Sequence, residues 1–224
     1  MSLPPVNNQQ RIQQTMLRIL EAKYQKRGLH FEPGGWGYFP VQIYGEIDGN
    51  RFYWRTGGNT STLSVGPYNK KLEEAIFQAH EKFRLQRLNQ HKAEQHPECK
   101  QGTCFTCLML TSPDYFLEND EQYYYPTQVI AFATVHPVGD PEDHYKGHLE
   151  LDEVAPLFTK LVESLEEVPL EYQIPISTLD MLEGKDLPIF ERVEVFSDKK
   201  EEQDAYIEAE RKRLTQKWAH LFVN

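Results

Sequence analysis

The sequence predicts an α+β protein, in which an antiparallel β-sheet packs with helices and a long helix lies near the C-terminus. Two observations carry this prediction. Apolar and polar residues alternate over residues 38–66, and apolar residues recur at helical spacing before and after that stretch. The composition is that of a folded chain, because 39% of the 224 residues are hydrophobic and 26% are charged.

An amphipathic helix is predicted over residues 8–27. Gly28 is placed to end this helix, since glycine adopts the left-handed conformation that commonly terminates one. The apolar positions that follow helical spacing are Ile12, Met16, Ile19, Leu20 and Tyr24.

Three strands of an antiparallel meander are predicted within residues 38–66. Two short segments rich in glycine, asparagine and aspartate provide the hairpin turns: Asp48-Gly49-Asn50 and Gly57-Gly58-Asn59. The alternation places the apolar side chains on one face of the sheet, where they can form a core.

The second strand of the meander has two different faces. Phe52 and Trp54 share the face that we expect to be core, and the opposite face carries Arg51, Tyr53 and Arg55. A basic and aromatic face can bind single-stranded nucleic acid. The sequence favours packing instead, because one short strand is a small platform and the chain has a net charge of −10. A nucleic-acid partner is therefore not expected.

The remaining elements continue the mixed pattern. A helix over residues 69–93 is predicted to begin at the capping residue Asn69. Two strands, at residues 105–110 and 127–136, are predicted to pair and to extend the sheet to five strands. Three helices are then predicted at residues 151–167, at residues 177–183 with Ser177 as cap, and at residues 198–222 with Ser197 as cap.

The last of these helices is highly charged and has a sparse apolar seam. The residues predicted to form the seam are Tyr206, Leu214, Trp218, Leu221 and Phe222. For the domains, we predict a mixed sheet and helix domain over residues 1–150 and an acidic helical extension over residues 151–224 that packs on it.

All three cysteines of the chain fall within nine residues, at Cys99, Cys104 and Cys107. The C-x4-C-x2-C spacing and the internal Gly102 are typical of a loop that wraps a metal ion or cluster, because soft thiolates bind zinc and iron–sulfur centres. Three thiolates leave one position of a tetrahedral zinc site to be filled. His96 or His91, just upstream, can complete a Cys3His set.

The same segment resembles the cluster-binding loop of plant-type [2Fe–2S] ferredoxins. Cys99, Cys104, Cys107 and Gly102 match the family's pattern, and the fourth cysteine of that family is missing. The resemblance implies an electron-transfer protein, in which His136 stands near the place of the last ligand. Without a metal, the thiols would be reduced, or Cys99 would pair with Cys104 or Cys107. The odd number of cysteines argues against a secreted disulfide scaffold.

A second resemblance lies in the meander. The segment from Val41 to Arg55, with its Asp48-Gly49-Asn50 turn, resembles a small β module of uncharacterised actinobacterial and phage-type proteins. It implies no activity. A further set of potential ligands follows His136, namely Asp140, Glu142, Asp143, His144 and His148, although such a run is also typical of a solvated turn.

Charge is distributed unevenly along the chain. Residues 1–110 contain 14 basic and 9 acidic residues, a net charge of +5, whereas residues 111–224 contain 10 basic and 25 acidic residues, a net charge of −15. The acidic half can attract a basic protein surface, and its solvated helices also explain the excess.

The sequence lacks the roughly 20 consecutive apolar residues of a membrane span. It also lacks a secretory signal at its start. We therefore expect a cytoplasmic protein with no membrane partner.

Three classes of function follow. The first is an accessory or interaction protein with a structural zinc site, and the second is a [2Fe–2S] electron-transfer protein. The third is a metal-free phage or mobile-element protein that binds a macromolecule. An enzyme is the class with the least support, because no nucleophile or phosphate-binding motif is present.

Overall fold

The computed structural model describes residues 8–32, 41–57, 59–93, 126–136, 151–184 and 199–222. The chain divides into two compact units, each made of two segments. Unit 1 comprises Met1–Tyr68 and Tyr123–Val168, and unit 2 comprises Asn69–Gln122 and Pro169–Asn224. The predicted domains, residues 1–150 and 151–224, stay a prediction.

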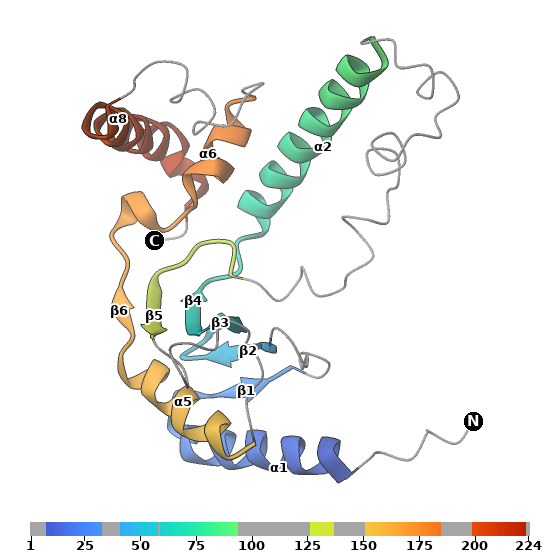
Figure 1. Cartoon of the computed structure of the whole chain (residues 1–224), viewed down its shortest axis with the longest axis vertical. Coiled ribbons are helices and arrows are strands. Elements are labelled where there is room, and N and C mark those ends of the chain that lie inside the picture. Colours follow the sequence, from blue (N-terminus) through green and yellow to red (C-terminus); the bar gives the residue numbers. More distant parts are fainter. Residues whose placement is uncertain are drawn as a thin grey trace. The chain divides into compact units, whose positions relative to one another are not determined.

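The α+β class is confirmed. Unit 1 contains one antiparallel sheet whose six described strands lie in chain order (Figure 1). The strands are β1 (His30–Phe31), β2 (Val41–Ile47), β3 (Asn50–Gly57), β4 (Thr60–Gly66), β5 (Ala131–Val135) and β6 (Glu166–Glu167). The predicted meander corresponds to β2, β3 and β4.

The first hairpin turn has the geometry that its residues predict. Asp48 and Gly49 both have positive φ angles, 53° and 73°, as a two-residue turn with the right twist requires. The turn is also tied to the segment before the sheet. The Asp48 backbone N–H donates to the Arg27 carbonyl at 2.6 Å, and the Arg27 guanidinium donates to the Asp48 carboxylate.

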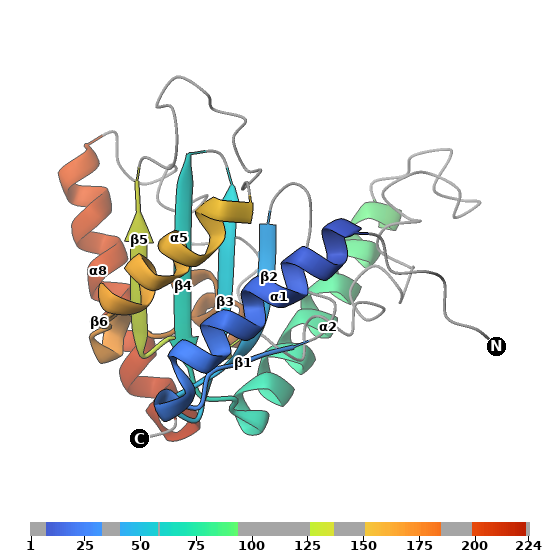
Figure 2. The same cartoon turned by 90° about the horizontal axis from the view of Figure 1, so that it is seen from below.

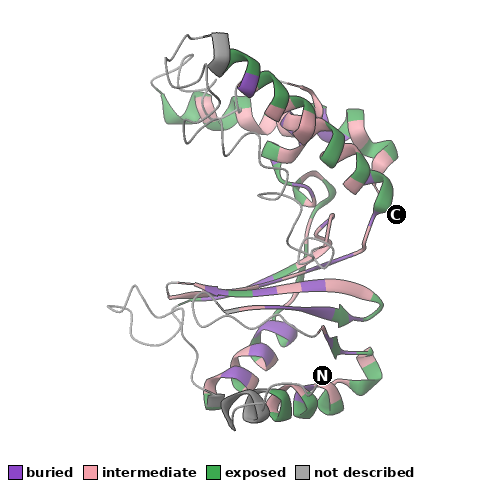
Figure 3. Ribbon diagram, turned by 90° about the vertical axis from the view of Figure 1, so that its right-hand side faces the viewer, coloured by how far each residue is buried: buried purple, intermediate pink, exposed green. Residues whose placement is uncertain are grey.

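Two helices of unit 1 cover the same face of the sheet (Figure 2). They are α1 (Asn8–Lys23), which continues into the 3-10 turn η1 (Gln25–Arg27), and α5 (Leu151–Glu163). Gly28 ends η1 with a φ of 64°, as predicted. The buried residues of the strands and of α5 face each other across this interface (Figure 3).

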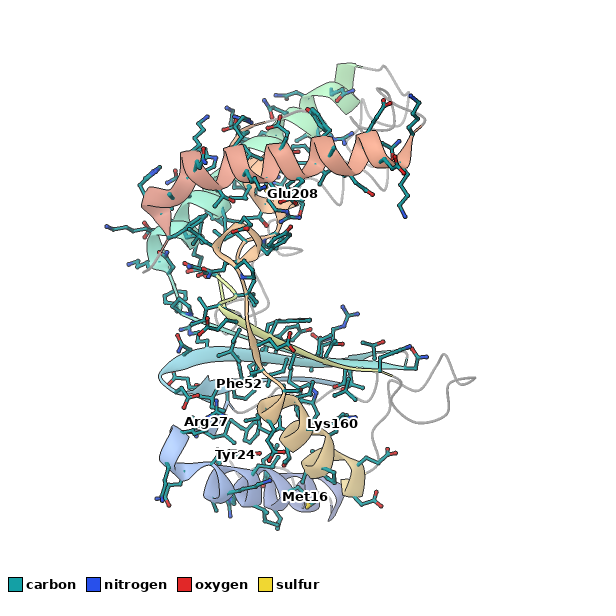
Figure 4. All side chains as sticks on the ribbon, turned by 90° about the vertical axis from the view of Figure 1, so that its left-hand side faces the viewer. Met16, Tyr24, Arg27, Phe52, Lys160 and Glu208 are labelled. Atoms are coloured by element: carbon teal, nitrogen blue, oxygen red, sulfur yellow. The ribbon has the colours of Figure 1, made fainter. Side chains whose placement is uncertain are left out.

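Aromatic rings fill the core between the sheet and these helices. Phe52 and Trp54 are fully buried, as predicted, and both pack against Phe158 of α5, with ring centroids 5.7 and 5.1 Å away. Figure 4 labels Phe52 and Tyr24 in this layer. Ile19, predicted as an apolar position of α1, is instead 54% exposed, because the helix buries Leu20 and packs Tyr24 against Phe158.

Some element boundaries in unit 1 differ from the prediction. Helix α5 ends at Glu163 rather than at residue 167, because Glu166 and Glu167 pair with β5 as β6. At this end the Ser164 hydroxyl donates a hydrogen bond to the Lys160 carbonyl. The predicted strand at residues 127–136 is confirmed as β5, and it pairs with β4 and β6. The predicted strand at residues 105–110 lies outside the described residues.

Unit 2 is helical in its described part. Its elements are α2 (Lys70–Ala93), η4 (Leu170–Tyr172), α6 (Ile176–Leu182), α8 (Lys200–Trp218) and η5 (Ala219–Leu221). Helix α6 packs against both α2 and α8. The unit has a hydrophobic core of its own, formed by Leu72, Ile174, Ile176, Leu179 and Leu214.

The helix starts in unit 2 show one correct and one wrong capping prediction. The Asn69 side chain accepts a hydrogen bond from the Leu72 N–H at 3.1 Å, which confirms it as the cap of α2. Ser177 does not cap α6, because the helix already begins at Ile176, after Pro175. Ser197, the predicted cap of the last helix, lies outside the described residues. Tyr206 of α8 is 39% exposed rather than packed in the seam.

Candidate functional site

The structure describes little of the predicted metal site. Cys99, Cys104, Cys107 and His96 lie outside the described residues. His91 belongs to the last turn of α2, where only the backbone is described. Of the six predicted ligands, His136 alone has a described side chain.

His136 follows β5 in unit 1 and lies beside the turn that joins β3 to β4. Its Nδ1 lies 3.2 Å from the Asn59 carbonyl oxygen and 3.0 Å from the Thr60 hydroxyl. Because a carbonyl only accepts, the contact with Asn59 requires a proton on Nδ1, and the tautomer with Nδ1 protonated is the one whose Nε2 has a free lone pair. Metal-binding histidines are commonly held in this way. An exposed histidine at a hairpin end makes the same contacts without a metal.

The described residues do not contain an assembled metal site. Across them, no three His, Cys, Asp or Glu side chains gather closely enough to hold an ion. The potential ligands at residues 140–148 lie outside this set.

A second feature of unit 1 is the sheet face that α1 and α5 do not cover, which we call the polar face. It consists of Gln42, Tyr44, Glu46, Arg51, Tyr53, Arg55, Thr62, Ser64, Phe132 and Thr134. The sequence indicated only its β3 residues. The others become neighbours of these through the strand register, which cannot be seen along a single strand.

Two tyrosines in the middle of the polar face hold each other in place. The rings of Tyr44 and Tyr53 are stacked, with centroids 5.4 Å apart and an angle of 17° between the ring planes. The Tyr53 hydroxyl donates to Gln42 Oε1 at 3.0 Å. One face of the Tyr53 ring is therefore occupied by Tyr44. Arg55 and Thr134 are exposed, and Phe132 is 38% exposed.

Unit 2 contains a cluster of charged groups between α6 and α8. The Glu183 side chain is only 9% exposed and accepts hydrogen bonds from Lys217 and from Arg213 Nη2, the latter at 3.3 Å. Burial alone would raise the pKa of Glu183, but the two cations outweigh it and lower that pKa below its ordinary value. This ion-pair cluster joins the end of α6 to the second half of α8.

Charge is segregated along α8 itself. After Lys200, all the acidic residues precede all the basic ones: Glu201, Glu202, Asp204, Glu208 and Glu210 come before Arg211, Lys212, Arg213 and Lys217. This order suits the helix dipole, which favours anions near the N-terminus and cations near the C-terminus. Glu208, labelled in Figure 4, also accepts a hydrogen bond from the Tyr172 hydroxyl at 2.9 Å.

No protein-family model, no curated protein and no solved structure matches this chain. Within the described residues, none of the helices combines the length and the apolar character that crossing a membrane requires.

Proposed function

We propose that the chain is a cytoplasmic accessory or interaction protein that carries a structural zinc ion on its cysteine-rich segment. One observation carries the proposal, the spacing of Cys99, Cys104 and Cys107 with His91 and His96 shortly before them. Clustered thiols together with an odd cysteine count suit a reducing compartment better than a disulfide scaffold.

The zinc would act on folding rather than on a substrate. A segment with little apolar content gains stability from a tetrahedral set of ligands, and the free energy of metal binding then becomes free energy of folding. His91 adds a reason to expect the site beside α2, because that helix brings its last turn close in sequence to Cys99.

A [2Fe–2S] electron-transfer protein is the second candidate, favoured by the ferredoxin-type spacing of the three cysteines. His136 would be the fourth ligand in this case. Its Nδ1 contact with the Asn59 carbonyl leaves Nε2 as the ligating atom, which supports a ligand role without requiring one.

The metal content of freshly purified protein, combined with its visible spectrum, separates these candidates. We expect about one zinc per chain, without colour. Cys104→Ser lowers the zinc content, whereas Thr106→Ser, in the same segment but without a ligand atom, leaves it unchanged. A loss of zinc in His91→Ala or His96→Ala, but not in His136→Ala, identifies the nitrogen ligand.

Other results would reject the zinc proposal. Visible absorption with bound iron supports the cluster. Metal-free protein whose three thiols all react with a maleimide rules out both centres and leaves the third candidate, a metal-free phage or mobile-element protein that binds a macromolecule.

For the partner of this protein, we propose a basic protein surface. The support is the net charge of −15 over residues 111–224 and the acidic first half of α8. Such a complex weakens with added salt, because its exposed charges become screened.

A further inference from the structure

Arg51, near one end of the polar face, has a buried nitrogen that is among the polar atoms of the described residues without a hydrogen-bond partner. Arg51 Nη1 is buried without a hydrogen-bond partner, although the residue as a whole is partly exposed. Among the described residues, the ion pairs of unit 1 join Lys23, Arg27 and His30 to carboxylates, and none includes Arg51. Arg211 differs, although its Nε is also buried. The Glu208 carboxylate lies 3.8 Å from that Nε, and the Glu171 carbonyl accepts a hydrogen bond from Arg211 Nη1.

The unsatisfied Nη1 of Arg51 is more costly than the other unsatisfied buried atoms of the described residues. Arginine cannot lose its proton in a protein, so it cannot avoid the penalty by becoming neutral. Tyr24 Oη, Thr215 Oγ1 and Trp218 Nε1 belong to neutral groups, whereas Arg51 Nη1 is a donor of a charged guanidinium, and an unmade hydrogen bond costs more at a charged group.

The surroundings of Arg51 fix the plane of its guanidinium. Arg51 Cζ lies 3.9 Å from the centroid of the Tyr68 ring, close enough for a cation–π contact. On β4 the cross-strand neighbour is Gly66, which has no side chain. A Cβ at Gly66 would lie 1.7 Å from the Gln128 carbonyl oxygen, so the segment after Pro126 closes this side of the arginine.

The cross-strand neighbour on β2 is Glu46, whose side chain is exposed and makes no ion pair with Arg51. The Tyr68 ring therefore lies against the Arg51 guanidinium, and the Gln128 backbone lies beside Gly66, the neighbour of Arg51 on β4. The carboxylate adjacent in register, that of Glu46, is exposed and does not pair with Arg51.

We propose that Arg51 forms a binding site for a single oxyanion group, a phosphate or a carboxylate of a ligand. The planar fork of a guanidinium matches two oxygens of either group, and stacking on Tyr68 orients that fork before the ligand arrives. The site lies in unit 1 and does not depend on the proposed zinc.

Thermal unfolding in phosphate, in acetate and in chloride at matched ionic strength tests this site on the full chain. We expect phosphate or acetate to raise Tm by roughly 2–4 °C over chloride. Because phosphate also stabilises folded proteins in general, the site is measured by the part of the rise that is lost in Arg51→Gln and kept in Arg55→Gln, which removes an exposed arginine from the same face of the same strand. A larger effect of phosphate assigns the site to phosphate groups, and a larger effect of acetate assigns it to carboxylates.

A second measurement needs no variant and decides the case in which Arg51→Gln fails to fold. The side-chain nitrogen resonances of Arg51 in the wild-type protein are followed by NMR during the same titrations. A shift at Arg51 without one at Arg55 supports the site. Equal Tm values in all three salts together with an unchanged Arg51 resonance overturn it, as does a Glu46→Gln variant that loses as much stability as Arg51→Gln, since Glu46 is then the counter-charge.

Discussion

One indole N–H and two hydroxyls form a hydrogen-bonded group in the core of unit 1. Trp54, Thr56 and Ser61 are fully buried, and Ser61 lies at the centre of the group. The Trp54 indole N–H donates to Ser61 Oγ at 2.8 Å, and the hydroxyls of Ser61 and Thr56 lie 2.8 Å apart. Because an indole N–H can only donate, the serine oxygen is what allows a tryptophan to be buried here.

Replacing Ser61 with alanine is therefore expected to destabilise the protein by about 1–3 kcal/mol, because it leaves the Trp54 N–H buried without an acceptor. Urea unfolding followed by tryptophan fluorescence measures this loss. Ser64→Ala is the matched control, since Ser64 lies on the same strand but on the polar face. We expect the control to change stability by less than about 0.5 kcal/mol. Equal effects of the two substitutions would contradict the network.

At the scale of the elements, the sequence predicted those that depend on local signals. The meander follows from alternation and from the Asp48-Gly49 turn, and α2 follows from Asn69 and helical periodicity. The two-residue edge strands β1 and β6 were not predicted, because they are strands only through their pairing with β2 and β5.

The errors also have physical causes. Ser177 was expected to cap a helix that in fact begins one residue earlier, with the extended Pro175 (ψ 136°) in the flanking position. Tyr206 has the spacing of a seam residue, but α8 packs Ile207 in its place. The candidate sites also divide into features that local sequence signals predict and features that only the fold creates. The cysteine spacing can be read along the chain, whereas the stacking of Arg51 on Tyr68 requires the folded turn after β4.

The stability contributed by the ion-pair cluster between α6 and α8 should depend on pH. The pKa of Glu183 lies below its ordinary 4.5 in the folded state, so its carboxylate stabilises the fold above about pH 4.5. That contribution is lost as the pH falls through the lowered pKa. Glu183→Gln should cost about 1 kcal/mol near pH 7, since both cations are about half exposed. The difference from wild type should shrink in acid.

Unfolding by urea at neutral and at acidic pH, followed by circular dichroism, measures this dependence. Glu74→Gln serves as the control, because the Glu74 side chain is exposed and its ion pair with Lys70 lies within one turn of α2. It should have little effect at either pH. A Glu183→Gln variant whose deficit stays constant from neutral to acidic pH would show that the carboxylate does not stabilise the link.

At the scale of the whole molecule, the chain builds two units out of alternating segments. Each unit has its own hydrophobic core, one around Phe52, Trp54 and Phe158 and the other around Leu72 and Leu214. Neither unit is a continuous stretch of sequence, so neither can complete its fold until the later segment has been made. Composition along the chain therefore says little about where one unit ends.

Two separate cores predict two separable unfolding transitions. A substitution in one core should lower the transition of its own unit and leave the other in place, because the two cores share no residue. Ser61→Ala perturbs unit 1. Asn69→Ala perturbs unit 2, since it removes the cap of α2 and the hydrogen bond from the Asn69 amide to the Leu221 carbonyl. Losing the cap alone costs about 1 kcal/mol.

Differential scanning calorimetry of the wild type and of the two variants tests this arrangement. Asn69→Asp separates the effects of the two Asn69 hydrogen bonds in unit 2, because it keeps the capping oxygen and loses only the donor to Leu221. The transition temperature of unit 2 in Asn69→Asp should lie between those of the wild type and Asn69→Ala. If Ser61→Ala and Asn69→Ala instead shift one common transition by similar amounts, the two cores unfold together. The units are then compact parts of one cooperative fold rather than independent domains.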